Sequence, residues 1–278
     1  MSPPTETPCY TGWATAYVEL NGRKFFRSAS ASSPISFVDA EQQARKLARE
    51  RAEAAAAGKQ PLTSDGTYPY PERVLVEPVL ERLVVPGPSG SHEIARVTRN
   101  SYDASVLNAY NVMFVDVDTT TDSSNAPEEK TVSQSEALEA LADLIYSRPE
   151  LQFRIYATKA GLRYLCTSHL FDPVSSESQD ILKRLKADKR YTLLCRVQKC
   201  YRARLSPKYW RCVLKPTKKR GFFSRLLGSN ETRVNPRQFA TCHYLETVGT
   251  NTIILPEIAL VLRLHDEASE AFSAKPLA

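Results

Sequence analysis

The stretch Val112-Met-Phe-Val-Asp-Val-Asp118 predicts a β-strand, because it is apolar and rich in β-branched residues and a polar, turn-forming segment follows it. Two aspartates, Asp116 and Asp118, occupy alternate positions in it. Side chains at positions i and i+2 of a strand share one face, about 6.5 to 7 Å apart along the chain. The neighbours of opposite parity, Met113, Val115 and Val117, are apolar and suit a core face. We therefore expect both carboxylates on the open face of a sheet, near the end of the strand.

The segments that follow predict the rest of an antiparallel sheet. The tetrapeptide Ser133-Gln-Ser-Glu136 has the capping-box spacing and begins a helix with one apolar stripe, which Pro149 ends. Residues 153–156 and 162–166 are predicted strands, joined by a turn at 159–161. A sheet with at least three antiparallel strands is therefore expected.

Two further elements complete the predicted core. Ser175 or Ser176 caps a second helix, and residues 191–197 are predicted to form one more strand. The order is then β-α-β-β-α-β, which is the ferredoxin-like arrangement of an antiparallel sheet with two helices on one face. The predicted fold class is α+β with a ferredoxin-like core.

An N-terminal extension precedes this core. Asn21-Gly22 separates two alternating runs and predicts a hairpin, because both residues tolerate a positive φ. An alanine-rich helix is expected from about Asp39 to Ala57, with its alanine face on the hairpin. Residues 59–91 are rich in proline and glycine and are interpreted as a linker-like covering segment.

The predicted domain boundary lies between an extension at residues 1–92 and a core at residues 93–278. The core ends in a C-terminal appendage with a basic segment, further strands at 239–248 and 251–255, and a closing helix that Pro256 begins and that runs through Leu264.

The composition excludes several classes of protein. The chain has 278 residues, of which 42% are hydrophobic, and is long enough to bury a core without disulfides or structural metals. No apolar stretch approaches the ~20 residues of a membrane-spanning helix. The N-terminus shows no basic region followed by an apolar run, and the six cysteines are scattered. We therefore expect a cytoplasmic protein with reduced thiols and no membrane partner.

The charge distribution points to a polyanionic partner. The formal net charge is only +6, but the stretch from Lys183 to Arg225 contains 16 basic residues and a single acid, Asp188. Tyrosine, tryptophan and phenylalanine are interleaved with these basic residues. Basic residues with aromatic side chains are typical of a groove that holds single-stranded nucleic acid.

The paired aspartates predict a metal site. Asp116 and Asp118 on one strand face repel each other unless a cation lies between them, and carboxylates suit Mg²⁺ or Mn²⁺. The alternative is a pair of solvated acids at a strand end. Zinc is not expected, because the cysteine spacings do not match a zinc site.

Five basic residues are predicted to bind phosphate groups, since ammonium and guanidinium groups pair well with phosphate oxygens. Two stand in the predicted hairpin and three in the basic segment. They are Lys159, Arg163, Arg202, Arg204 and Lys208. The alternative is that they form an ordinary solvated basic face.

The stretch Phe114-Val-Asp-Val-Asp118, followed by a helix and then by Tyr156-Ala-Thr-Lys-Ala-Gly-Leu-Arg163, resembles the archaeo-eukaryotic primase superfamily. It is most similar to primase-polymerases and to the polymerase domains of bacterial end-joining ligases. Arg204-Leu-Ser-Pro-Lys208 looks like a loose version of their Arg-Leu-Pro segment. The resemblance covers about residues 110–210. It implies a metal-dependent nucleotidyl transferase with nucleic acid and nucleoside triphosphates as partners.

The chain departs from that family's pattern at two points. Arg163 stands where the family has a hairpin histidine, and an arginine cannot relay a proton at neutral pH. The family also has a third carboxylate, for which Asp188 and Asp172 are the candidates here. A non-catalytic nucleic-acid-binding module on the same fold is therefore the first alternative.

A second alternative uses the same acids. Asp116-Val-Asp-Thr-Thr120 matches the Asp-x-Asp-x-Thr motif of haloacid-dehalogenase-type phosphatases. In that family the first aspartate is the nucleophile and the second the acid/base. That hypothesis requires parallel strands around the motif.

Overall fold

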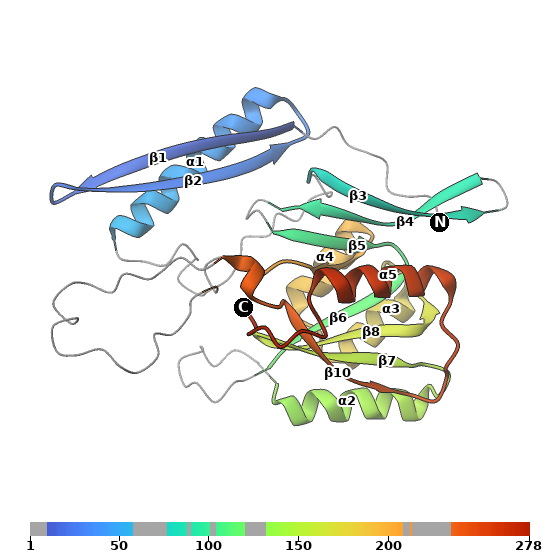
Figure 1. The fold of residues 1–278 in the computed structure, drawn as a ribbon. Coiled ribbons are helices and arrows are strands. Elements are labelled where there is room, and N and C mark those ends of the chain that lie inside the picture. The colour runs from blue at the N-terminus through green and yellow to red at the C-terminus, as the bar shows by residue number, and fades with distance from the viewer. Residues whose placement is uncertain are drawn as a thin grey trace, which may run out of the picture.

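The computed structural model describes residues 10–57, 77–87, 90–100, 104–119, 132–207, 212 and 235–278. In this part of the chain the fold is α+β, with antiparallel sheets (Figure 1). The strands are β1 (Tyr10–Leu20), β2 (Arg23–Ser33), β3 (Val79–Gly87), β4 (Gly90–Arg99), β5 (Ser105–Ala109), β6 (Val112–Asp118), β7 (Phe153–Thr158), β8 (Gly161–Leu170), β9 (Tyr201–Arg204) and β10 (Cys242–Val248). The helices are α1 (Phe37–Ala56), α2 (Gln134–Ser147), α3 (Ser176–Arg184), α4 (Lys189–Gln198), α5 (Pro256–Ala268) and the short 3₁₀ turn η3 (Pro236–Gln238).

The N-terminal hairpin and helix form as predicted. Asn21 and Gly22 make the turn with φ values of 51° and 74°. The Ser36 hydroxyl accepts a hydrogen bond from the backbone N–H of Asp39, 3.1 Å away, at the start of α1. Helix α1 lies against the hairpin (Figure 1). Its alanine face is fully buried, at Ala40, Ala44, Ala48 and Ala52.

The central sheet has the strand order β10-β7-β8-β6, and every pair in it is antiparallel. The predicted capping box is confirmed, since the Ser133 hydroxyl accepts from the N–H of Glu136 while the Glu136 carboxylate accepts from the N–H of Ser133. Ser175 caps α3 through the N–H of Ser178. The predicted order of elements thus holds from β6 through α3.

The strand predicted at residues 191–197 is wrong, because this segment belongs to helix α4. The Asp188 carboxylate accepts from the N–H of Tyr191 at 2.7 Å and caps the helix. A short apolar run is compatible with the side-chain period of a strand and with that of a helix, and here the buried residues recur at helical spacing. The fourth strand of the sheet is instead β10, which pairs with β7.

A second antiparallel sheet has the order β3-β4-β5-β9. Residues 79–87, expected to be part of a linker, form strand β3. The boundary expected between residues 92 and 93 lies inside β4, which pairs with both β3 and β5. Short strand β9 pairs with β5 and ends at Arg204.

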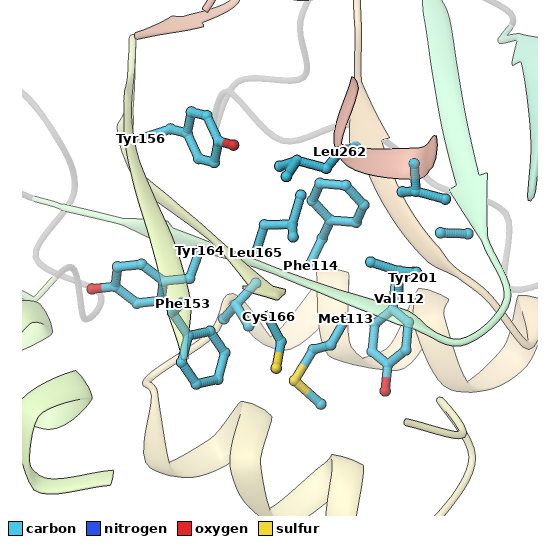
Figure 2. Packing of buried hydrophobic residues seen from close by; sticks show 14 of the residues in the cluster. Val112, Met113, Phe114, Phe153, Tyr156, Tyr164, Leu165, Cys166, Tyr201 and Leu262 are labelled. Atoms are coloured by element: carbon cyan, nitrogen blue, oxygen red, sulfur yellow. The ribbon is translucent and has the colours of Figure 1, made fainter. Parts of the chain in front are cut away.

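Helices cover both faces of the central sheet, rather than the single face that was predicted. Figure 2 shows Phe114 and Leu165 directed toward Leu262 of α5, whereas Met113 and Cys166 point to the opposite face. The buried hydroxyl of Tyr164 donates to a backbone carbonyl of α2 on that opposite face. The face that carries the even-numbered residues of β6 is therefore covered in part by α5.

Two general predictions concern the membrane and the cysteines. In the described part of the chain, no helix combines the length and the apolar character needed to cross a bilayer. Cys166, Cys195, Cys200 and Cys242 are buried free thiols, and Cys212 is buried as well.

Candidate functional site

Five of the predicted residues meet in a small pocket where β6 ends and the β7–β8 hairpin turns. Its volume is about 100 Å³. The charged side chains that line it are Asp116, Asp118, Lys159, Arg163 and Arg204. Thr158, Ala160, Leu162, Thr241 and Ala278 complete the lining. Residues distant in the sequence are thus brought to one place, which we call the hairpin pocket.

Glycine at position 161 permits this arrangement. A Cβ atom there would lie 2.1 Å from the carbonyl oxygen of Val117 and 2.7 Å from the amide nitrogen of Thr119. Gly161 pairs with Asp118 across the two strands. The backbone that approaches Gly161 closely is that of β6 and of the residue after it.

Asp116 and Arg163 form a two-point ion pair across β6 and β8, where they are register partners. The Arg163 Nε donates to Asp116 Oδ1 at 2.7 Å, and its Nη2 donates to Oδ2 at 3.2 Å. The arginine side chain is 4% exposed and that of the aspartate 34%. Both carboxylate oxygens of Asp116 therefore accept from a buried cation of the same chain.

The remaining nitrogen of Arg163 points deeper into the protein. Its Nη1 donates to the carbonyl oxygen of Arg204 at 3.1 Å and lies 3.4 Å from His265 Nε2. Burial by itself lowers the pKa of Arg163, but the charge and hydrogen bonds of Asp116 raise it above the ordinary arginine value. Arg163 is therefore a fixed structural cation.

His265 continues the chain of polar contacts to Asp266. Its Nδ1 lies 3.0 Å from Asp266 Oδ1, and burial lowers the pKa of the imidazole, so it is neutral near pH 7. Nδ1 then carries the proton donated to Asp266, and Nε2 accepts from Arg163. Asp266 also accepts from Arg154 at 2.6 Å and from the Tyr156 hydroxyl at 2.7 Å. Two ion pairs are thereby linked through one neutral histidine.

Lys159 and Arg204 differ from Arg163 in their surroundings. Lys159 is exposed at the turn of the hairpin. The Arg204 side chain is half-buried, and no carboxylate of the described residues forms an ion pair with its guanidinium. Asp118 is exposed on the same pocket wall. The pocket thus contains two cations that Asp116 does not neutralise.

Other predicted site residues lie elsewhere. Arg202 donates to both oxygens of Glu77, at 2.8 and 2.9 Å, and to Gln198, and it does not line the hairpin pocket. The Asp188 carboxylate caps α4, although its backbone N–H donates to the carbonyl oxygen of Asp116 at 3.0 Å. Lys208 is outside the described residues.

The pocket does not fit the expected Mg²⁺ or Mn²⁺ site well. No group of three or more histidine, cysteine, aspartate or glutamate side chains with metal-binding geometry occurs among the residues that the structure describes. Of the two carboxylates present, that of Asp116 is already paired with Arg163. A divalent cation would have to compete with a guanidinium held by four polar contacts.

His265 and Asp266 were not predicted from the sequence, because the closing helix was expected to end at Leu264, whereas α5 runs to Ala268. In the sequence, the available signal for this part of the site was that two titratable residues are adjacent in an otherwise apolar stripe of the helix. That pattern does not show that the two side chains contact residues of β7 and β8.

Comparison with known proteins adds no assignment. No protein-family model, curated protein or solved structure matches this chain.

Proposed function

We propose that this protein is a nucleic-acid-binding module that holds a backbone phosphate group in the hairpin pocket, without catalysing nucleotidyl transfer. The observation that carries this proposal is the ion pair between Asp116 and Arg163. Because it neutralises Asp116 internally, Lys159 and Arg204 remain available for an external anion. Cations that neutralise phosphates supply most of the affinity for nucleic acid.

The size of the pocket supports a phosphate group rather than a whole nucleotide. Its volume of about 100 Å³ is well below the ~300 to 1,000 Å³ typical of sites that enclose a small organic ligand. A phosphate group of a longer strand, with its sugar and base outside the pocket, fits this volume. The basic segment that begins at Lys183 is the source of further phosphate contacts along such a strand.

The resemblance to the primase superfamily supports the same class of ligand. The elements β6, α2, β7, β8 and α3 follow the order expected for that fold, and we propose that they are a divergent, ferredoxin-like primase core. Of the residues predicted to bind metal or phosphate, Asp116, Asp118, Lys159, Arg163 and Arg204 line the hairpin pocket, whereas Arg202, Asp188 and Asp172 do not. Arg163 replaces the family's histidine and alters what the neighbouring acid is able to bind.

Salt-dependent binding tests this proposal. Fluorescence anisotropy with a labelled 20-nucleotide single-stranded DNA or RNA, over a range of salt concentrations, gives the slope of log K against log salt. Lys159→Gln and Arg204→Gln should each weaken binding and reduce the magnitude of that slope by about 0.7 to 1. The control is Arg263→Gln, an exposed arginine of α5 outside the pocket. An unchanged slope in both pocket variants contradicts the proposal.

A second candidate is the nucleotidyl transferase of the primase-polymerase type. The presence of Asp116, Asp118 and Lys159 in one pocket favours it. Purified protein with Mn²⁺ or Mg²⁺, labelled nucleotides and a primed template should then extend the primer, and Asp118→Asn should abolish that extension. Binding without extension supports the non-catalytic module.

The structure does not favour the phosphatase hypothesis. That hypothesis required parallel strands around Asp116, and β6 instead pairs antiparallel with β8, which pairs antiparallel with β7. We therefore do not propose phosphatase activity.

A further inference from the structure

The connection between α3 and α4 lies against the edge of β6 that does not pair with β8. The backbone N–H of Asp188 donates to the carbonyl oxygen of Asp116 at 3.0 Å, and the Tyr191 hydroxyl donates to that of Phe114 at 2.7 Å. In the described part of the chain β6 is the last strand of the central sheet, so this connection satisfies carbonyl groups of its outer edge. We call residues 183–190 the α3–α4 corner. It touches the backbone of Asp116, which lines the hairpin pocket.

Local hydrogen bonds hold the backbone of the corner in place. The N–H of Lys186 donates to the carbonyl oxygen of Lys183 at 3.1 Å, and that of Ala187 donates to Leu182 at 2.9 Å. The Asp188 carboxylate caps α4, so its charge faces backbone N–H groups of that helix. The basic side chains of the corner therefore extend from a fixed backbone.

The corner has a large excess of exposed positive charge. Its five cations are all exposed, and Asp188 is its single acid. The cations are Lys183, Arg184, Lys186, Lys189 and Arg190. Exposed cations gathered in this way attract a polyanion.

The cations of the corner differ in how far other side chains neutralise them. A hydrogen bond from the Ser133 backbone, one from its side chain and then the charge of Lys186 lower the pKa of the Glu136 carboxyl in α2, so Lys186 has an acid close by. Arg184 donates to the Ser147 hydroxyl at 2.6 Å. Lys189 forms no ion pair with any carboxylate that the structure describes. Lys189 is therefore the cation of the corner best able to bind an external anion.

The corner and the β7–β8 turn lie on opposite sides of the C-terminal end of β6. Gly161 of β8 pairs with Asp118 on one side, and the corner bonds to the backbone of Asp116 on the other. One strand spacing, the contact to the corner and a few residues of rise separate the backbones of Lys159 and Lys189, roughly 15 to 20 Å in all. A single phosphate group does not span this distance, whereas an extended strand of nucleic acid does.

We propose that the α3–α4 corner binds phosphates next to the one in the hairpin pocket, so that a single strand of nucleic acid crosses the end of β6 from Lys159 to Lys189. This inference rests on the function proposed for the pocket and assigns the surface onto which the bound strand continues. A chain of phosphates is the occupant that fits, because cations on both sides of one strand end then neutralise separate charges of the same molecule.

Salt-dependent anisotropy with a labelled 20-nucleotide single strand measures the contact. Lys189→Gln and Lys186→Asn should each reduce the magnitude of the slope of log K against log salt by about 0.7, the value for one phosphate contact on a single strand. Asparagine suits position 186, because the backbone there has a φ of 55°, which asparagine tolerates. The matched control is Lys46→Gln, which changes an exposed lysine of α1 and should keep the parent slope.

Glu136→Gln provides a change in the opposite direction. Glutamine can still form the capping box at the start of α2, but it removes the negative charge that lies close to Lys186. The affinity at low salt should therefore rise about twofold. Loss of folding does not produce such a gain, so this variant keeps the test valid if a lysine variant is unstable.

Lysine footprinting tests whether one strand covers both surfaces. Lys159, Lys189 and Lys46 are exposed and should all react with N-hydroxysuccinimide acetate in the free protein, as read by mass spectrometry of the peptides. The oligonucleotide should protect Lys159 and Lys189 at the same concentration and leave Lys46 reactive.

Three outcomes overturn the proposal. In the first, both corner variants keep the parent slope while Lys159→Gln and Arg204→Gln reduce it, which leaves the pocket proposal intact. In the second, Lys189 is protected only at a higher oligonucleotide concentration than Lys159, so that the corner binds a separate strand. In the third, the two pocket variants keep the parent slope, so that the function proposed for the pocket fails and this inference fails with it.

Discussion

Arg163 neutralises Asp116 from the neighbouring strand, with 2.7 Å between the Arg163 Nε and Asp116 Oδ1. The two residues are register partners in β8 and β6, so the backbone pairing of the sheet fixes the ion pair. The arginine is the more deeply buried partner. An aspartate that the sequence marks as a metal ligand is thus, in the folded chain, the counter-ion of a buried arginine.

Removal of the charge at Asp116 should destabilise the fold. Asp116→Asn leaves the buried guanidinium of Arg163 without its counter-ion, and loss of one partner of a buried pair costs about 3 to 5 kcal/mol. Because Asp116 is 34% exposed, we expect the lower end of that range, about 3 kcal/mol. Urea denaturation followed by circular dichroism measures the free energy of unfolding.

The matched control for this variant is Asp143→Asn, which changes an exposed aspartate of α2. Its free energy of unfolding should stay within about 0.5 kcal/mol of the parent protein. If Asp116→Asn is as stable as this control, Arg163 does not depend on Asp116 and the proposed internal neutralisation fails.

The second prediction concerns the pH dependence of stability. Burial lowers the pKa of His265 below its ordinary value, so the unfolded chain binds a proton at this residue before the folded chain does. The free energy of unfolding should therefore decline as the pH falls below about 6.5, by up to ~1.4 kcal/mol per pH unit. The groups that face His265 are Arg163, Asp266, Cys242 and Tyr156.

Replacement of this histidine should reduce the dependence on pH. His265→Gln lowers stability at pH 7.5 but should show a smaller decline between pH 7.5 and 5.5 in urea denaturation. His169→Gln changes an exposed histidine and should keep the full decline. Equal declines in the parent protein and in His265→Gln would show that His265 is not the group responsible.

Local signals predicted much of the fold, and long-range contacts decided the rest. Asn21-Gly22, Ser133 and Pro256 each act within a few residues, and the elements that they begin or connect were predicted with small errors in their ends. The prediction for residues 191–197 was wrong because a short apolar run is compatible with the side-chain period of a strand and with that of a helix. The N-terminal cap at Asp188 then decides that the segment is helical.

The hairpin pocket, like the fold, was predicted in part from the sequence and decided in part by long-range contacts. Sequence order and spacing indicated that Asp116, Lys159 and Arg204 belong to one site, and the structure brings them together. The sequence did not show that Arg163 would pair with Asp116, because this depends on the register of β6 against β8. It also did not place α5 over that face, which supplies His265 as a contact of Arg163.

The third prediction concerns thiol reactivity. Burial raises the pKa of Cys166, Cys195, Cys200 and Cys242 above the ordinary cysteine value, and the thiolate is the reactive form. Ellman's reagent should therefore label these four thiols slowly in the native protein and rapidly in 6 M guanidinium chloride. Mass spectrometry of the labelled peptides assigns each site. Rapid native labelling of Cys195 or Cys200 would contradict their burial.

The final prediction tests the close approach that forms the hairpin pocket. Gly161→Ala places a Cβ atom 2.1 Å from the carbonyl oxygen of Val117, so β8 must move away from β6. Overpacking of this kind costs about 1 to 3 kcal/mol, and backbone atoms on the other side leave little room for relaxation. Gly22→Ala is the control, because nothing lies within 4 Å of its Cβ and its cost is limited to the left-handed φ, about 1 kcal/mol. Gly161→Ala should lower both the free energy of unfolding and the affinity for single-stranded DNA, whereas Gly22→Ala should lower only the first. Equal DNA affinity in the two variants would show that the junction of β6 and β8 does not shape the binding site.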